Sequence, residues 1–353
     1  MPESRVDLRS DTFTVPDRAM RRAMAEAEVG DDVWGEDPTV RHLEETIAAM
    51  LGKAAALYVP SGTMANLCAV AAQTRPGDEV ICDTEAHLVV YEVAGSAAIA
   101  GVQLRTVDAS GGVPTAAMVE AAVRLPNIHH PRSRLLALEN THNRRGGLAV
   151  HAAATAEAAE AAHRHGMAVH CDGARIFNAA VALDCPAAAL AEHCDTVSVC
   201  FSKGLGAPVG SALTGAVETV DEARRWRKRL GGGMRQAGVI AAAALHALQH
   251  NVDRLAEDHA HARLLADLLG DAPGVRVVRP AVPTNIVLLE TAAPAVEVAE
   301  RAAAQGVLAS VMDRHLLRCM TYLGVDAGAV RRAATVLRPV LRECAAARPH
   351  PAG

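Results

Sequence analysis

Short apolar segments alternate with helix-like segments over most of this chain, and this alternation limits the folds open to it. The apolar segments are strand candidates, namely "AALYVP", "DEVICD", "VQLRTVD", "RLLALEN", "MAVHCDG" and "TVSVCFS". Helical patterns such as "TAAMVEAAVRL" and "TAEAAEAAHRHG" lie between some of them. Apolar strands joined by helices are typical of a mostly parallel sheet with helices on both faces. We therefore expect an α/β fold in which helices sandwich a mostly parallel sheet.

The pattern changes near residue 250. A long helical stretch covers roughly residues 237–269, and the strand candidates "VRVV", "NIVLLE" and "LLRCMTYL" follow it, with helical patterns between and after them. A chain of 353 residues has about the length of two packed domains. We expect a large domain over residues 1–250 and a small C-terminal α+β domain over residues 251–353, with the N-terminal segment free to pack on the small domain.

The composition is that of a soluble globular protein, with 50% apolar residues, 21% charged residues and a net charge of −5. This mixed charge gives no indication of a nucleic-acid partner, and no long apolar run predicts a membrane span. The N-terminal "MPESRVDLRSD" is charged and unlike a signal peptide. The eight cysteines contain no Cys-x-x-Cys pair, which favours reduced thiols and a cytoplasmic location.

Chemically distinctive residues follow several of the strand candidates. Gly62 and Thr63 open a helical pattern after "AALYVP", and His87 follows "DEVICD". Asp172 is the last residue but one of "MAVHCDG", and Lys203 follows "TVSVCFS". The carboxyl ends of parallel strands meet at one edge of a sheet, where ligands bind, so we expect these residues to lie close together.

Each of these residues also has a structural explanation when it is taken alone. The segment "SGTMAN" could be an ordinary capped helix start, and Asp172 could simply pair with Arg175. Lys203 could extend to solvent, and His87 could be a buried histidine that is hydrogen-bonded in the core.

Taken together, the residues favour one cofactor. Pyridoxal phosphate needs a phosphate site, a carboxylate for its ring nitrogen and a lysine for its aldehyde. A helix N-terminus supplies the first, Asp172 the second and Lys203 the third.

Seven motifs then point to a known family. In chain order they are "VDLRSDTFTVP", "VGDDVWGEDPTV", "VPSGTMAN", "ALENTHN", "HCDGARIFNAA", "SKGLGAPVGS" and "RWRKRLGGGMRQAG". The set resembles the low-specificity L-threonine aldolases, which belong to the fold type I enzymes that depend on pyridoxal phosphate. The resemblance runs from about residue 5 to beyond residue 330.

The resemblance implies a fold, a reaction and an assembly. The fold is the type I large domain with a small C-terminal α+β domain. The reaction is the retro-aldol cleavage of L-threonine, L-allo-threonine or a related β-hydroxy-α-amino acid to glycine and an aldehyde. The assembly is a homotetramer, built as a dimer of dimers, whose active sites are shared between subunits.

The resemblance also implies roles in holding the cofactor. Lys203 binds the aldehyde, Asp172 pairs with the ring nitrogen, and His87 stacks on the ring. Gly62 and Thr63 bind the phosphate.

Further residues are implied at the phosphate and the substrate. Lys228 and Arg235 reach the phosphate across a subunit interface. Ser10, Arg175 and Arg318 hold the substrate carboxylate, and Arg175 also belongs to the cofactor-binding set. His129 lies near the substrate hydroxyl, so that His87 and His129 are both candidates for its proton acceptor, as is a bound water.

Three positions depart from the family pattern. Trp34 stands where a tyrosine is usual, Tyr322 where a histidine is common, and Ala94 where a glycine is usual. The residues leave two other interpretations open, namely another fold type I lyase or racemase and a non-catalytic binding protein. No cluster of ligands in the sequence specifies a metal ion.

Overall fold

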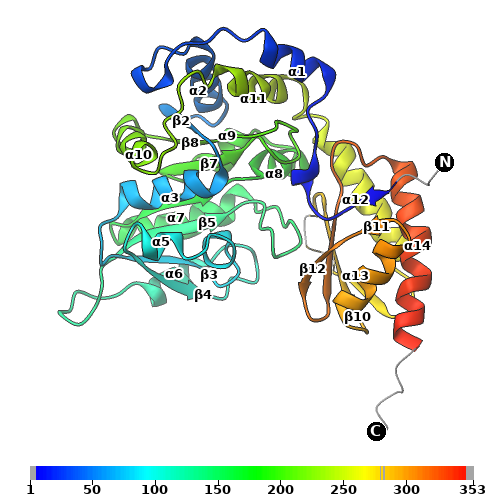
Figure 1. Ribbon diagram of the computed structural model, residues 1–353. Helices are drawn as coiled ribbons and strands as arrows, with labels where there is room; N and C mark the ends of the chain where they lie inside the picture. The colour runs from blue at the N-terminus through cyan, green and yellow to red at the C-terminus, as the bar shows by residue number, and fades with distance from the viewer. Residues whose placement is uncertain (1–4, 279, 281–282, 347–353) are drawn as a thin grey trace.

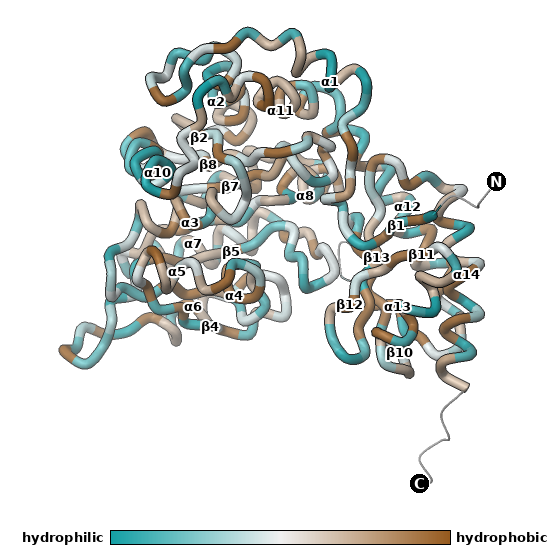
Figure 2. Tube along the Cα trace, in the orientation of Figure 1, coloured by the Kyte–Doolittle hydropathy of each residue, from teal (hydrophilic) through white to brown (hydrophobic). Residues whose placement is uncertain are grey.

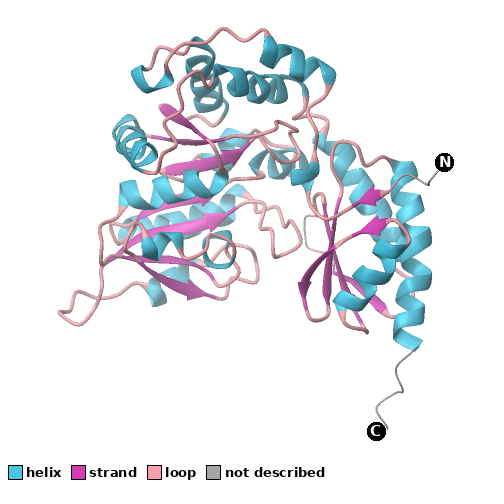
Figure 3. Ribbon diagram, viewed as in Figure 1, coloured by secondary structure: helices cyan, strands magenta, loops and turns pink. Residues whose placement is uncertain are grey.

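The computed structural model describes residues 5–278, 280 and 283–346 (Figure 1). Two bodies lie side by side, a large α/β body and a smaller α+β body (Figures 1 and 3). Within the described residues, no helix combines the length and the apolar character that crossing a membrane requires.

The large body is organised by one sheet, which has seven strands among the described residues, in the order β2–β8–β7–β6–β5–β3–β4. The strands are β2 (Ala55–Val59), β3 (Glu79–Asp83), β4 (Gln103–Val107), β5 (Ser133–Glu139), β6 (Ala168–Asp172), β7 (Thr196–Cys200) and β8 (Ser211–Gly215). The pairs from β4 to β7 are parallel, whereas β8 is antiparallel to both of its neighbours. The prediction of a mostly parallel sheet is confirmed.

Helices cover both faces of this sheet because the side chains of each strand alternate between two apolar cores. Ala56 and Tyr58 of β2 pack into the core beneath α2, α7, α8 and α11, while Leu57 and Val59 pack beneath α3 and α10. The helices of the large body are α1 (Arg18–Ala25), α2 (Pro38–Met50), α3 (Gly62–Gln73), α4 (His87–Val90), α5 (Gly95–Ala98), α6 (Ala116–Ala122), α7 (Ala152–Arg164), α8 (Ile176–Leu183), α9 (Ala187–Ala191), α10 (Val217–Arg229) and α11 (Gly238–His250). Figure 2 shows α10 mostly in hydrophilic colours, as expected for a helix that buries only a narrow stripe.

The small body is built on an antiparallel sheet in the order β12–β13–β10–β9. Its elements are α12 (Leu255–Leu269), β9 (Val275–Val278), β10 (Ile286–Thr291), α13 (Ala295–Ala304), β11 (Val307–Leu308), β12 (Ser310–Asp313), β13 (Leu316–Met320) and α14 (Ala327–Ala346). The N-terminal strand β1 (Val6–Asp7) pairs with β11, so the first described residues lie in the small body. The division of the chain at residue 250 remains our proposal, and it falls at the end of α11.

One expectation about a single element is wrong, and one strand was not expected. The helical stretch over 237–269 is two helices, because α11 ends at His250 and α12 begins at Leu255. Asn251 caps α11, and its side chain donates to Leu205 O at 2.7 Å, which fixes the turn. Strand β8 was not expected, because the glycines and the proline of "GAPVGS" are typical of a loop.

The connection between α4 and α5 contains two strained residues, Val93 with φ +51° and Ala94. Ala94 precedes α5 with φ +55°, a left-handed conformation that favours glycine. This is also the position at which a glycine is usual in the family pattern.

We predict that Ala94→Gly stabilises the protein by about 0.5–1 kcal/mol, because the left-handed conformation costs an L-residue about 1–2 kcal/mol and the added chain entropy of glycine offsets only part of this. The free energy of unfolding from urea titration measures the effect. Ala97→Gly, within α5, is the matched control and should lower that free energy by about 0.5–1 kcal/mol. A loss of stability in both variants would contradict the assignment of strain to Ala94.

Candidate active site

A cavity of about 180 Å³ lies between the two bodies. It is lined by Ser10, Thr12, His87, Tyr91, Asn143, Arg175, Lys203 and Arg318. Most of these residues follow the carboxyl ends of parallel strands, while Arg318 comes from β13 of the small body. The structure therefore brings together five residues named from the sequence, which are Ser10, His87, Arg175, Lys203 and Arg318.

Asp172 lies next to this cavity as a buried carboxylate with several partners. Asn66 Nδ2 donates to its Oδ2 at 2.7 Å, and Ala174 N donates to its Oδ1 at 3.0 Å. Burial raises the pKa of Asp172, but the charges of His87 and Lys203 and the bond from Asn66 outweigh burial and lower it. The carboxylate is therefore held in its charged form, as partnership with a protonated ring nitrogen requires.

His87 is held by a second buried carboxylate. Its Nδ1 lies 2.8 Å from Glu92 Oε1, which leaves Nε2 without a protein partner among the described residues. Burial lowers the pKa of His87, but the bond to Glu92 and the charge of Asp172 raise it above its ordinary value. The ligand atoms of His87, Glu92 and Asp172 lie within 4.8 Å of one another, a spacing that a metal ion could also use.

Two arginines supply positive charge to the cavity. Arg175 is buried and makes a two-pronged ion pair with Asp11, with both N–O distances at 2.7 Å. Arg318 donates to Asn143 Oδ1 at 2.9 Å, and its buried Nε has no partner among the described residues. Burial and the charge of Arg175 lower the pKa of Arg318. Two guanidinium groups that line one cavity offer a site for an anion such as a carboxylate.

The start of α3 fits a phosphate group. Ser61 caps the helix by accepting from Met64 N at 3.2 Å, and Gly62 and Thr63 begin its first turn. A Cβ atom on Gly62 would lie only 2.7 Å from Cys200 Sγ, so glycine is required for α3 to approach the end of β7. The free N–H groups of a helix start attract an anion, and Lys203 lies three residues beyond Cys200.

Besides Asp172, Gly62 and Thr63, three more residues named from the sequence do not line this cavity in the same chain. Lys228 and Arg235 lie at and after the end of α10, and both are exposed, Arg235 with 80% of its side chain. His129 lies in the exposed connection between α6 and β5 (Figure 1). That connection precedes β5, whereas the cavity follows it, and a strand of this length spans about 20 Å. The roles expected of these residues therefore require a site of another subunit.

The departures from the family pattern also lie outside the cavity lining. Trp34 is 79% exposed. Tyr322 is buried and donates from its hydroxyl to Asp7 O at 2.8 Å, so it joins β1 to the small body.

Sequence reasoning missed five residues of the site and its surroundings, which are Thr12, Asn66, Tyr91, Glu92 and Asn143. Signals were present for four of them. Tyr91 lies four residues after His87, and Asn143 ends the quoted motif "ALENTHN". Thr12 lies in the motif "VDLRSDTFTVP" and Asn66 ends the motif "VPSGTMAN", whereas Glu92 lies in none of the seven motifs.

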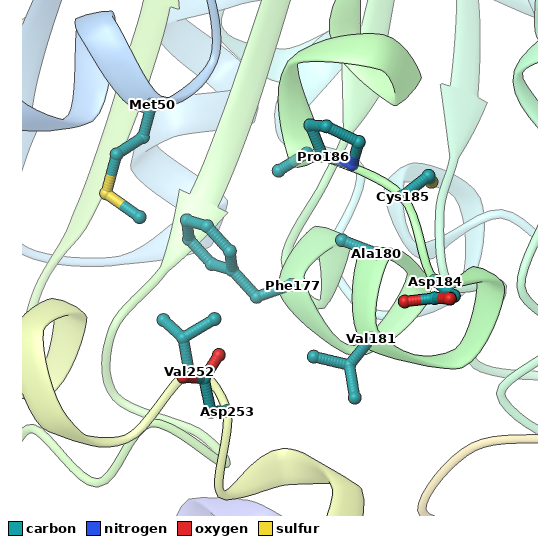
Figure 4. A pocket seen from close by; sticks show the side chains of 10 residues that line it. Met50, Phe177, Ala180, Val181, Asp184, Cys185, Pro186, Val252 and Asp253 are labelled. Carbon is teal, nitrogen blue, oxygen red and sulfur yellow. The ribbon is translucent and has the colours of Figure 1, made fainter.

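Cavity size alone does not identify this site. Figure 4 shows a pocket of about 440 Å³ that is lined by α2, α8, the start of α9 and the turn after α11. Its lining includes Met50, Phe177, Val181 and Val252, and it shares no residue with the cavity around Lys203. The smaller cavity is favoured because its side chains can bind anions and move protons.

Known structures share this architecture. A threonine aldolase of Leishmania major matches with a TM-score of 0.80 and 20% identity, over 95% of this chain and 99% of that chain. A serine palmitoyltransferase of Sphingomonas wittichii matches with a TM-score of 0.77 and 18% identity, over 98% of this chain and 89% of that chain. The architecture is that of the fold type I enzymes, as expected from the sequence.

Sequence comparison gives a narrower result. The family model described as β-eliminating lyase matches residues 7–292. The chain is 49% identical to low-specificity L-threonine aldolase 1 of Arabidopsis thaliana over 81% of both chains. It is 45% identical to the low specificity L-threonine aldolase of Escherichia coli strain K12, over 78% of this chain and 81% of that protein. The chain belongs to the β-eliminating lyase family and, within it, to the low-specificity L-threonine aldolases.

We predict that Asp11→Asn lowers the free energy of unfolding by about 3 kcal/mol, because it leaves the buried guanidinium of Arg175 without its counter-ion. Burial raises the pKa of Asp11, but the charge and hydrogen bonds of Arg175, together with the charge of Lys203 and the bond from Asn285, outweigh burial and lower it from its ordinary 3.8. The carboxylate therefore stabilises the fold above that value, and the difference from the native protein should shrink as the pH falls below it. Asp271→Asn breaks an exposed pair with Arg338 and is the control, with no measurable change expected. Equal losses in both variants would contradict the assignment.

Proposed function

We propose that this protein is an L-threonine aldolase that depends on pyridoxal phosphate. It cleaves L-threonine or L-allo-threonine, and related β-hydroxy-α-amino acids, to glycine and an aldehyde. One observation carries the proposal: Lys203, the charged Asp172 and the arginine pair meet around one cavity in a member of this family.

The residues present fit this cofactor. Lys203 would hold the aldehyde, Asp172 the ring nitrogen, and Gly62 and Thr63 the phosphate, with His87 against the ring. When bound, pyridoxal phosphate supplies a conjugated ring that accepts the electron pair released at Cα. Asp172 makes the ring a better acceptor, because a charged carboxylate keeps the ring nitrogen protonated.

The remaining groups orient the substrate. Arg175 and Arg318 bind its carboxylate, with Ser10 beside them. Fixing the carboxylate and the amino group also fixes the direction of the Cα–Cβ bond, and such alignment is a large part of catalysis.

The proton of the β-hydroxyl needs an acceptor. His87 Nε2 is available because Glu92 engages Nδ1. His129 is the second candidate, and it can act only on the site of another subunit. A positioned base typically contributes about 10²–10⁴-fold to the rate.

We also propose a cytoplasmic homotetramer, a dimer of dimers, in which each site receives residues from a second subunit. Exposed Trp34, Lys228 and Arg235 support shared sites, since they have no role in their own chain's cavity. The cysteines support a reducing compartment, because all eight are free and most are buried.

A β-elimination is the second candidate, because the matching family model is described as β-eliminating lyase. The products separate the two reactions. The aldolase yields glycine and acetaldehyde from L-threonine, whereas β-elimination yields a keto acid and ammonia.

We predict that the purified protein binds pyridoxal phosphate with visible absorbance and releases glycine and acetaldehyde from L-threonine. Lys203→Ala should lose both properties, because no other amine lines the cavity in the part of the chain that the structure describes. Lys53→Ala removes a half-buried lysine outside the cavity that is bonded to Cys194 O, and it serves as the control with unchanged activity. A Lys203→Ala protein that keeps full turnover would refute the assignment.

Shared sites make a sharp prediction for mixed oligomers. Lys203→Ala and Arg235→Ala should each be inactive alone. Refolded together in equal amounts, they should recover about a quarter of the native activity, because half the dimers are mixed and each mixed dimer has one complete site. Replacing Arg235→Ala by His129→Ala tests the histidine in the same way. Absence of recovery, with dimers present by size-exclusion chromatography, would show that each site belongs to one chain.

A further inference from the structure

We infer that Asn66 is a positioning residue that holds Asp172 and Glu92 in place, the first for the cofactor's ring nitrogen and the second for His87. This inference rests on the proposed function. Asn66 lies on α3, four residues after Gly62, and α3 packs against the strands β6 and β7. Residues four apart share one face of a helix, so α3 presents the phosphate site and Asn66 to the same region.

The amide of Asn66 is placed between the two carboxylates. Its Nδ2 lies 2.7 Å from Asp172 Oδ2 and 2.7 Å from Glu92 Oε1, so both of its hydrogens are used. All three side chains are buried. The carboxylate oxygens of Asp172 and Glu92 lie within 4.8 Å of each other, so the two buried charges repel. A donor that both share offsets this repulsion.

The orientation of the Asn66 amide is fixed by two groups that contact its oxygen. Ser198 Oγ donates to Asn66 Oδ1 at 2.8 Å, and His170 Nε2 lies 3.1 Å from the same oxygen. A flipped amide would place its oxygen against two carboxylates and its nitrogen against two donors. The network therefore permits one orientation.

A second row of hydrogen bonds continues in the same direction. Burial lowers the pKa of His170 to about 4, so the ring is neutral and carries one proton. If Nε2 donates to Asn66, then Nδ1 accepts from Thr196 Oγ1 at 2.9 Å. Thr196 Oγ1 in turn accepts from Gln73 Nε2 at 2.9 Å. Every donor from Gln73 to Asn66 points toward the carboxylates, and aligned bonds of this kind strengthen one another.

This arrangement leaves the carboxylates free to act. Each oxygen of Asp172 has one donor from the protein, Asn66 or Ala174, and keeps a lone pair for the ring nitrogen. Glu92 Oε1 receives Asn66 and His87 together, so the position of His87 depends on Asn66 as well. Besides His87, the positively charged group that faces Asp172 is Lys203.

The test compares Asn66→Asp with the native protein. The variant keeps the size and an acceptor oxygen of Asn66, removes both N–H donors and places a third carboxyl group against Asp172 and Glu92. We expect the dissociation constant of pyridoxal phosphate, from fluorescence titration of the cofactor-free protein, to rise by about 10- to 100-fold, since bonds to charged groups are lost. With saturating cofactor, kcat for L-threonine should fall while KM stays nearly unchanged, because Ser10, Arg175 and Arg318 are intact.

Asn178→Asp is the matched control. Asn178 is equally buried in the large body, and its Nδ2 faces His259 Nε2 at 3.1 Å instead of a carboxylate. This control should keep its cofactor affinity within about twofold. Equal losses in the two variants would reduce Asn66 to a structural role and overturn the inference, as would an Asn66→Asp protein with native affinity and kcat.

A milder variant covers the case in which Asn66→Asp does not fold. Ser198→Ala leaves Asn66 in place but removes one donor to its oxygen, and we expect about a threefold to tenfold loss of cofactor affinity. Native affinity in Ser198→Ala would then overturn the inference. Failure of the native protein to bind the cofactor or to cleave L-threonine would instead overturn the proposed function, which separates the two conclusions.

Discussion

The buried carboxylate of Asp172 can remain charged only because cations and N–H donors surround it. Removing a carboxylate from water without partners is very unfavourable, so the side chains around it are constrained in kind and in position. Asn66, His87 and Lys203 meet that constraint, and Arg175 meets it for the buried Asp11. The chemistry of the cavity is therefore fixed by charge compensation, while apolar packing fixes the sheet that carries it.

The N-terminal segment connects this charge system to both bodies. It begins in the small body, where β1 pairs with β11, and then passes the cavity at Ser10. Asp11 binds Arg175 of the large body and accepts from Asn285 Nδ2 of the small body at 3.2 Å. Thr14 Oγ1 donates to Lys203 O at 3.0 Å. A segment of a few residues thus contributes to the position of the small body, and with it Arg318, relative to Lys203, together with the direct bonds from Arg318 to Asn143 and from Thr284 to Gly147 O.

The sequence predicted the parts of the site that follow simple patterns. Asp172 ends an apolar strand, and Lys203 and His87 each follow one, so their common location follows from the parallel sheet. Glu92 and Asn66 escaped notice because a turn and the middle of a helix carry no such signal, and their importance arises from contacts between distant residues. Strand β8 was missed for a related reason, since burial between β2 and β7 overrides the turn propensity of its preceding residues. The roles of Lys228, Arg235 and His129 came from resemblance alone, and a single chain does not test them.

Buried polar contacts fix the two surface loops that carry Trp34 and Arg235. Asp32 makes a buried ion pair with Arg227 at 2.9 Å, and Asp32 N donates to Arg235 O at 2.9 Å. These bonds lock the turn after α10 to the segment that bears Trp34, which is 79% exposed. Removing the charges of Asp32 and Arg227 from water costs free energy. That cost is explained if the fixed shape of the two surface loops serves to bind a partner. A rigid surface with an exposed indole and unburied cations is typical of an interface, which is the arrangement that shared active sites require.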